Sequence, residues 1–200
     1  FKMAVVPFQM WVPDVYQGAP TPVAAFLSVG SKAAAFAVVT RIFFEGLGAD
    51  FLSDDWSMIF AIIAAVSMTL GNLMAVVQTD IKRMLGYSSV AQAGTFLIGL
   101  AAISVPGERF DLGGSGILLF TASYAFTNLG AFVAIIAISQ KIGSDQIRDY
   151  AGMWKRSPLL TVGLAFCLVS LTGIPPTAGF WAKIYIFNAG VRADLLWLVV

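Results

Sequence analysis

The 200-residue sequence predicts an all-α protein: a polytopic transmembrane helix bundle with discontinuous helices. Three observations lead to this fold class. Of the residues, 58% are hydrophobic and only 12% are charged, whereas soluble domains carry about 25% charged residues. Several apolar segments reach or approach the roughly 20 residues that a membrane-spanning helix needs. Two of these segments also contain clustered prolines, which an uninterrupted helix does not accommodate.

The first two apolar segments are separated by a proline-rich break. Residues 1–16 are predicted to be the tail of a span that ends in this break. Residues 22–44 form a complete span, and Pro22 suits the first turn of its helix. The helix-breaking residues of this part of the chain are Pro7, Pro13, Gly18, Pro20 and Pro22.

Further spans are predicted at residues 56–78, 84–105 and 114–140. The apolar segment 157–191 is too long for one straight helix and contains the sequence GIPPTAG. We interpret it as one crossing made of two half-helices, and a re-entrant hairpin is an alternative that hydropathy does not exclude. Residues 195–200 start another span. Because the chain begins and ends within apolar sequence, we expect residues 1–200 to be part of a single, longer transmembrane domain.

The loops between these spans alternate in charge. The 79–83 and 141–156 connections are basic, whereas the 45–55 connection is acidic. By the positive-inside rule, the two basic loops face the cytoplasm or its organellar equivalent. Residues 18–21 fall on the same side in this topology. The tryptophans near span ends, Trp56, Trp154 and Trp197, are typical of the membrane interface.

Three lysines lie away from these loops: Lys2, Lys32 and Lys183. Lys32 is at the midpoint of the 22–44 span, Lys183 follows GIPPTAG by one turn, and Lys2 precedes the first break. A lysine at mid-bilayer costs roughly 2.5–3.5 kcal/mol on insertion scales and is a functional-site hypothesis by default. The alternative for Lys2 is that its side chain extends to the membrane surface, and for Lys183 the two interpretations are equally open.

Buried lysines of this kind suit proton transfer, because removal from water favours the neutral amine and a neighbouring charge then decides whether a proton is held. Broken helices also occur where water or protein surrounds their free backbone groups. Polar residues within spans either extend such a path or bridge helices, and bridging is the commoner role. Those in question are Thr121, Tyr124 and Asn128 on one helix face, Ser123 and Thr127 on the next, and Asn72 and Gln78 elsewhere.

Cofactor chemistry within this chain is not expected. The sequence has no histidine and one cysteine, Cys167, which removes haem ligation, thiolate clusters and most zinc chemistry. It shows no nucleotide-binding loop or flavin motif, and no nucleic-acid partner is expected. A redox machine that contained this chain would carry its electrons in other subunits.

Three motifs resemble one family: PFQMWVPDVYQGAPTPVAAFLSVGSKAA, QTDIKRMLGYSSVAQAG and LTGIPPTAGFWAKIYIF. They are similar to the antiporter-like membrane subunit N, or chain 2, of proton-pumping NADH:quinone oxidoreductase. This family includes respiratory complex I and the related photosynthetic complex. The resemblance covers the whole chain and implies a C-terminal half-repeat of such a subunit.

The resemblance implies that Lys2, Lys32 and Lys183 are proton-relay residues coupled to quinone reduction elsewhere in the complex. It implies no cofactor in this chain, with NADH (or ferredoxin), flavin, iron–sulfur clusters and quinone handled by partner subunits. The implied location is the cell inner (plasma) membrane or the thylakoid membrane, among other membrane-arm subunits. Gln9 stands where the family commonly has His, so this position does not titrate. The alternatives are a subunit of a multisubunit cation/proton antiporter and a purely structural membrane-arm subunit.

Overall fold

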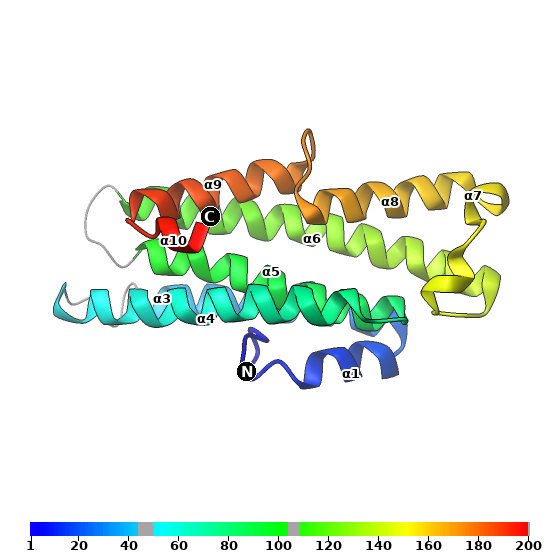
Figure 1. Cartoon of the computed structure of the whole chain (residues 1–200), viewed down its shortest axis with the longest axis horizontal. Helices are drawn as coiled ribbons and strands as arrows, with labels where there is room; N and C mark the ends of the chain where they lie inside the picture. Colours follow the sequence, from blue (N-terminus) through cyan, green and yellow to red (C-terminus); the bar gives the residue numbers. More distant parts are fainter. Residues whose placement is uncertain (44–49, 104–108, 200) are drawn as a thin grey trace.

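The computed structural model describes residues 1–43, 50–103 and 109–199. Within these ranges the chain forms helices joined by turns, and the longer helices run along the long axis of an elongated bundle (Figure 1). Four of the described helical segments are long and apolar enough to cross a membrane: Thr21–Arg41, Trp56–Val76, Ile81–Ala102 and Gly113–Ile142. The prediction of an all-α polytopic membrane protein is therefore confirmed.

The first break lies earlier than the sequence predicts. Residues 1–10 form a series of turns, and the first helix, α1, comprises only Trp11–Gly18. Continuous helix over residues 1–16 is therefore wrong, because Pro7 has no backbone N–H and restricts the residue before it. Pro13 is accommodated because it lies in the first turn of α1. The turn segment is held against the bundle by the Val6 amide, which donates to the Ser67 hydroxyl over 3.0 Å.

The second crossing is helical throughout but changes its pitch. It consists of α2 (Thr21–Phe26), the π-helical turn η1 (Leu27–Ser31) and α3 (Lys32–Arg41). Single π-turns of this kind insert one extra residue into the helical repeat and occur often at functional sites. Here the π-turn ends immediately before Lys32, so it changes the direction in which that side chain leaves the helix.

The helices α4 (Asp50–Val76) and α5 (Ile81–Ile103) form an antiparallel pair. Gly71 and Gly94 allow their close approach, because a Cβ on Gly71 would lie 2.6 Å from the Ala91 nitrogen. Helix α5 also contacts α1, α6 and α9, which makes it the central helix. In the candidate span of α5, 83% of the residues in the most apolar window are buried within the chain, compared with 22% in that of α4. Its mean hydropathy of 1.2 is the lowest of the four, so polar side chains are concentrated on the helix that is most buried within the chain.

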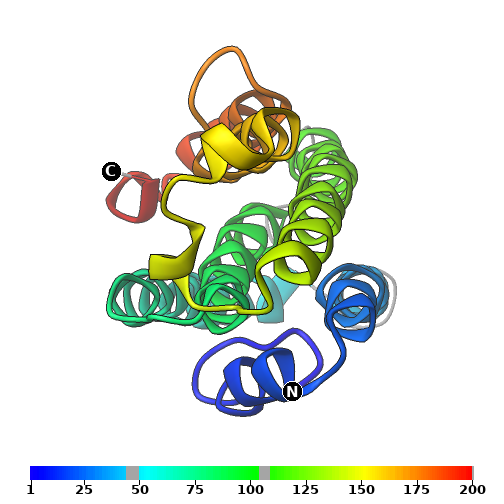
Figure 2. The same cartoon turned by 90° about the vertical axis from the view of Figure 1, so that its right-hand side faces the viewer.

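The C-terminal half begins with the long helix α6 (Arg109–Ile142). The 3₁₀ turn η3 (Ile147–Tyr150) and the short helix α7 (Met153–Arg156) follow it. The apolar segment after Ser157 is divided into α8 (Pro158–Thr172) and α9 (Ala178–Arg192), and α10 (Leu196–Val199) ends the described chain. Figures 1 and 2 show α8 and α9 in line with each other, as two half-helices of one crossing rather than the arms of a hairpin.

The two basic connections lie at the same end of the bundle, next to the α1–α2 turn (Figures 1 and 2). The Ile81 amide donates to the Asp145 carbonyl over 3.0 Å, and the Ile147 amide donates to the Thr79 carbonyl over 2.8 Å. These bonds join the turn before α5 to the loop after α6. The structure thus places the 18–21, 79–83 and 141–156 loops together, as the charge pattern requires of loops on one side.

Candidate functional site

Lys32 lies near the middle of the Thr21–Arg41 segment and points toward α5 rather than toward the outside of the bundle. Only 3% of the residue is exposed. Its ammonium group donates a hydrogen bond to the Ser89 carbonyl of α5. No carboxylate within the described ranges forms a salt bridge with it. A buried cation held by a carbonyl rather than by a counter-charge is costly in a purely structural role.

Other polar side chains surround Lys32. The Asn128 amide of α6 donates to the Ser28 hydroxyl over 2.6 Å, and Ser28 itself donates to the Ala25 carbonyl over 2.7 Å. The Tyr16 side chain of α1 is almost fully buried, and its hydroxyl lies near the side chains of Ser28 and Ser89. The elements α1, α2–α3, α5 and α6 therefore each contribute a polar group to this region.

Lys183 lies in α9 and faces the end of the preceding half-helix. Its ammonium group donates to the carbonyls of Leu171 and Thr172, each over 3.0 Å. The last carbonyls of a helix have no intrahelical partner and carry the negative end of the helix dipole. The break thus creates acceptors for this lysine.

Two glycines make this arrangement possible. Gly173 ends α8 in the left-handed conformation (φ 86°), and a Cβ there would lie 2.9 Å from Cδ of Lys183. Gly179 begins α9 so close to α8 that a Cβ would lie 1.8 Å from the Ser170 carbonyl oxygen. The sequence GIPPTAG therefore encodes the close packing of the two half-helix ends, in addition to interrupting the helix.

The two lysine regions are connected through α5. Gln92 lies one turn after Ser89, and residues at this spacing share a helix face. Its amide nitrogen donates to the Leu171 carbonyl over 2.9 Å, the same oxygen that accepts from Lys183. Lys32, Ser89, Gln92 and the half-buried Lys183 therefore lie along one polar line from α3 to α9, in which Ser89 and Gln92 share a face of α5.

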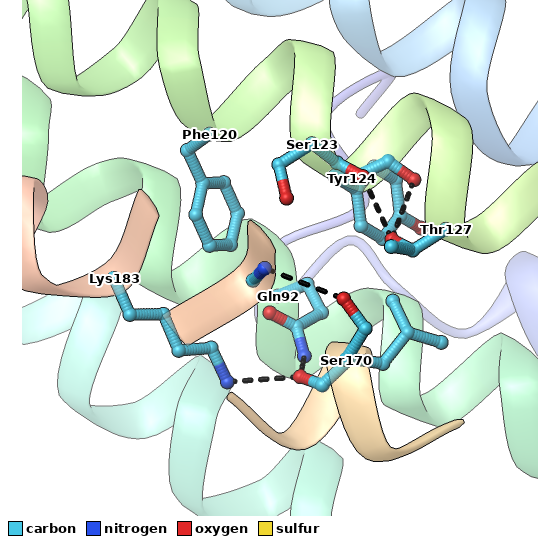
Figure 3. A pocket seen from close by; sticks show the side chains of 9 residues that line it. Gln92, Phe120, Ser123, Tyr124, Thr127, Ser170 and Lys183 are labelled. Atoms are coloured by element: carbon cyan, nitrogen blue, oxygen red, sulfur yellow. Dashed lines mark hydrogen bonds between the residues drawn. The ribbon is translucent and has the colours of Figure 1, made fainter. Parts of the chain in front are cut away.

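A small cavity of about 10 Å³ lies beside this line (Figure 3). Among its lining residues are Gln92, Ser123, Tyr124 and Lys183. The hydroxyls of Ser123 and Tyr124 are buried, and neither has a hydrogen-bond partner among the described residues. The volume is of the order that one water molecule occupies. A water bound here would connect α6 to the polar line and satisfy hydroxyls that burial otherwise leaves unpaired.

Lys2 is not part of this line. It is exposed in the turn segment before α1 and lines an open cavity of about 420 Å³ with Ser31, Ala34 and Val38 of the second crossing. Ser31 is the neighbour of Lys32, so Lys2 lies on the side of α3 adjacent to the face that carries Lys32. Of the three predicted lysines, Lys32 bonds to α5, Lys183 shares an acceptor with Gln92 of α5, and Lys2 lies apart from this helix.

Several functional candidates were missed in the sequence. Ser89, Gln92 and Thr95 repeat at helical spacing within a predicted span, and this polar stripe is a signal that marks the inner face of α5. For Ser123 and Tyr124 the sequence favours a role in bridging helices, because side-chain polarity alone does not reveal that a hydroxyl is buried without a partner. Gln9 also carries an unpaired polar atom, because its buried side-chain oxygen Oε1 has no hydrogen-bond partner in the described part of the chain.

Lys82 was assigned to a loop, yet only 7% of it is exposed. It forms a 2.9 Å ion pair with Asp145 in the loop after α6. Partial burial by itself raises the pKa of the Asp145 carboxyl, but hydrogen bonds from Ser139 and Lys82, together with the Lys82 charge, place this pKa below its ordinary value. Nearby, Arg83 binds Asp14 of α1 over 2.5 Å. These two ion pairs join α5 to α1 and to the loop after α6 at the basic end of the bundle. Asp14 is therefore a partner of Arg83.

Curated relatives are about half identical to this chain over the region that aligns with it. NAD(P)H-quinone oxidoreductase subunit 2 of Synechocystis sp. is 52% identical over 200 residues, which cover 100% of this chain and 37% of that protein. NADH-quinone oxidoreductase subunit N of Dehalococcoides mccartyi is 51% identical over 201 residues, covering 100% and 41%. The chain thus spans about two fifths of the length of these relatives.

Solved structures with the same fold come from three kinds of complex. A chain of respiratory complex I from Thermus thermophilus matches with a TM-score of 0.76 at 32% identity, covering 99% of this chain and 41% of that one. A chain of an archaeal membrane-bound sulfane sulfur reductase matches with a TM-score of 0.87 at 27% identity, covering 98% and 39%. A chain of the Mrp complex from Dietzia sp. matches with a TM-score of 0.87 at 26% identity, covering 99% and 35%.

A family profile described as the NADH:quinone oxidoreductase/Mrp antiporter transmembrane domain matches residues 1–200. This match spans both helix breaks, the central helix α5 and the polar line between Lys32 and Lys183. The chain belongs to the NADH:quinone oxidoreductase/Mrp antiporter transmembrane family.

Proposed function

We propose that this chain is the C-terminal half-repeat of an antiporter-like subunit that translocates protons within an NADH:quinone oxidoreductase. In this proposal Lys2, Lys32 and Lys183 relay protons, and the driving reaction takes place in other subunits. The observation that carries the proposal is the polar line, in which two lysines from different helices are linked through α5. Identity of 51–52% to subunit N and subunit 2 proteins favours the oxidoreductase over its relatives.

In the polar line the lysine amines are the groups that exchange protons, whereas the Ser89 carbonyl and the Gln92 amide position them. A protonated Lys32 donates to a carbonyl, so its own proton is held by a weak acceptor rather than by a carboxylate. Tyr124 and Ser123 are hydroxyl groups, which both accept and donate, and they border the cavity next to Lys183. A water in that cavity would link these hydroxyls to Lys183, and proton transfer between Lys183 and Lys32 requires further water along α5. Lys2, beside its open cavity, is proposed as the relay group nearest the outside of this half-repeat.

The proposed setting follows from the relatives. Other membrane-arm subunits and the bilayer surround the chain, and the quinone pool is reached only indirectly. Flavin, iron–sulfur clusters and the NADH or ferredoxin site belong to partner subunits. The membrane is the plasma membrane or the thylakoid membrane, with the basic loops 79–83 and 141–156 on the cytoplasmic side.

NADH-driven acidification of inverted membrane vesicles tests the proposal. The variant Lys32→Ala is compared with Lys32→Arg, which keeps the charge, and the NADH oxidation rate is recorded in the same sample. We expect Lys32→Ala to lose both acidification and turnover in an assembled complex, because the relay group is gone. Unchanged acidification and turnover in that variant would mean that the lysine is structural.

A cation/proton antiporter is the second candidate function. It is favoured by the TM-score of 0.87 to a chain of the Mrp complex, which exceeds the 0.76 to a chain of complex I. The two candidates differ in what drives transport. Vesicles in which deletion of this subunit abolishes sodium-dependent proton exchange, but leaves NADH oxidation unaffected, would identify the antiporter.

A further inference from the structure

The short helix α7 carries exposed basic and aromatic side chains at one end of the bundle. Trp154 is 62% exposed, and Lys155 and Arg156 are exposed as well. Lys141, at the end of α6, is joined to them because its ammonium group donates to the Ser157 hydroxyl over 2.6 Å. We refer to Lys141, Trp154, Lys155 and Arg156 as the α7 patch.

The α7 patch is fixed in position although its side chains face outward. Met153, at the start of α7, is only 2% exposed and packs into the core. The Lys155 amide donates to the Gly152 carbonyl over 3.1 Å, and the Ser157 amide donates to the Met153 carbonyl over 2.8 Å. The charged side chains therefore project from a defined backbone, which lowers the entropic cost of binding a ligand.

The acidic residues of the same connection do not neutralise the α7 patch. Asp145 is paired with Lys82 over 2.9 Å, and Asp149 accepts from Ser144 over 2.6 Å and lies 3.6 Å from Arg148. Within the described part of the chain, no salt bridge involves Lys141, Lys155 or Arg156. The patch therefore presents a net positive charge, and the charge complementary to it is an anion.

An apolar surface continues from the α7 patch along the bundle. Helix α8 begins directly after Ser157, and Leu159, Val162 and Phe166 occupy one face of it at helical spacing. All three are exposed, Leu159 by 84%. Figure 1 shows α7 at the outer end of α8, so a cationic group, an interfacial tryptophan and an acyl-chain-sized apolar face follow one another from the membrane surface inward.

We propose that the α7 patch and the outer face of α8 bind an anionic phospholipid, with its phosphate on Lys155 and Arg156 and an acyl chain along Leu159 and Phe166. Basic side chains next to a transmembrane helix attract anionic lipids with about 1 kcal/mol per residue. Trp154 lies at the level of the headgroup, where tryptophan is favoured. This site is separate from the polar line and does not depend on the proposed proton translocation.

Photolabelling of the assembled complex tests this proposal. The complex is placed in phosphatidylcholine nanodiscs with a sub-saturating amount of phosphatidylglycerol that carries a photoactivatable acyl chain, and labelled peptides are mapped. The double variant Lys155→Gln/Arg156→Gln is compared with Arg41→Gln/Arg192→Gln, which removes two arginines at the opposite end of the bundle. We expect labelling of residues 153–166 to fall roughly thirtyfold in the first variant, about fivefold per charge, and to persist in the second.

Three results would overturn the proposal. Equal labelling in the two variants would mean that the charges do not hold the lipid. Equal labelling by a phosphatidylcholine probe would mean that the headgroup charge is not recognised. Complete displacement of the lipid by soluble glycerol phosphate would identify a site for a free anion.

A measurement on the unaltered protein covers the case in which the double variant does not assemble. Labelling by phosphatidylglycerol is followed as the salt concentration rises. We expect it to fall while labelling by phosphatidylcholine stays constant, because salt screens exposed charges. Salt-independent labelling by both probes contradicts the proposal.

Discussion

Both breaks in this chain place a lysine within a few residues of prolines, but the second break encloses its lysine and the first leaves it exposed. Lys183 donates to two carbonyls at the end of α8 and shares one of them with Gln92. Lys2 lines an open cavity beside α3. In the second break the two half-helices lie in line, with Gly179 directly against Ser170. In the first, the residues before α1 are turns.

The difference shows that a helix break by itself does not enclose a lysine. A helix break provides carbonyls and amides that have no intrahelical partner. In this chain a lysine binds such carbonyls at the second break, where the two half-helix ends meet. Close contact between backbones requires glycine, and α5 must supply a further donor such as Gln92. The following predictions test this comparison, beginning with the largest expected effect.

Replacing Gly179 with alanine should destroy the second break. The new Cβ would lie 1.8 Å from the Ser170 carbonyl oxygen, so the two half-helices must separate. We expect a loss of about 3 kcal/mol or more and failure of the subunit to assemble, measured by native gel analysis of solubilised membranes. The matched control is Gly163→Ala in α8, where an added Cβ has no neighbour within 4 Å. Normal assembly of Gly179→Ala would show that the contact is not required.

Replacing the lysines with alanine should separate stability from transport. Lys183→Ala removes two charge-assisted hydrogen bonds, each worth about 1.5–3 kcal/mol, so thermal stability of the purified complex should fall along with proton translocation. Lys2→Ala removes an exposed side chain, and its stability should change by less than about 0.5 kcal/mol while translocation is lost. Equal stability losses in the two variants would remove the distinction between the breaks.

Tyr124→Phe should slow proton translocation without loss of stability. The Tyr124 hydroxyl is buried and has no partner among the described residues, so its removal deletes an unpaired group rather than a bond. We expect turnover to fall roughly tenfold, below the usual range for loss of a direct acid–base group, with an unchanged melting temperature. Tyr185→Phe, at an exposed position of α9, is the control. Equal rates in both variants would exclude Tyr124 from the relay.

The smallest effect is expected at the Lys82–Asp145 pair, at the basic end of the bundle. The pKa of Asp145 lies below its ordinary value of 3.8. The ionised carboxylate therefore contributes stability in full above pH 3.8, and this contribution is lost as the pH falls through the lower, folded pKa. Asp145→Asn should lower the melting temperature near neutral pH and flatten its decline below pH 3.8. Parallel melting curves for variant and parent over this range would mean that the pair is not coupled to folding.

Much of the fold follows from local properties of the sequence. Helix breaks can be predicted because proline removes a backbone donor wherever it stands, and spans because the bilayer sets their length. Residues 1–10 form turns instead of the predicted helix. The sequence does not show this, because the effect of Pro7 on the residues before it depends on their contacts with the bundle, such as that of Val6 with Ser67. Lys32 could be identified from its central position alone, since the lengths of the lysine side chain and the helix decide whether it reaches the interface.

The partners of these residues are decided only by the tertiary structure. Ser89 and Gln92 belong to a polar stripe that the sequence shows, but their contacts, with Lys32 and with the Leu171 carbonyl respectively, arise because α5 lies at the centre of the bundle. Lys82 looks like a loop residue, and the loop after α6 buries it against Asp145. Composition and periodicity act over a few residues, and they determined the membrane class, the spans and the breaks. Burial and hydrogen bonding depend on segments distant in the chain, and so only the packing of helices decided which lysines share a line.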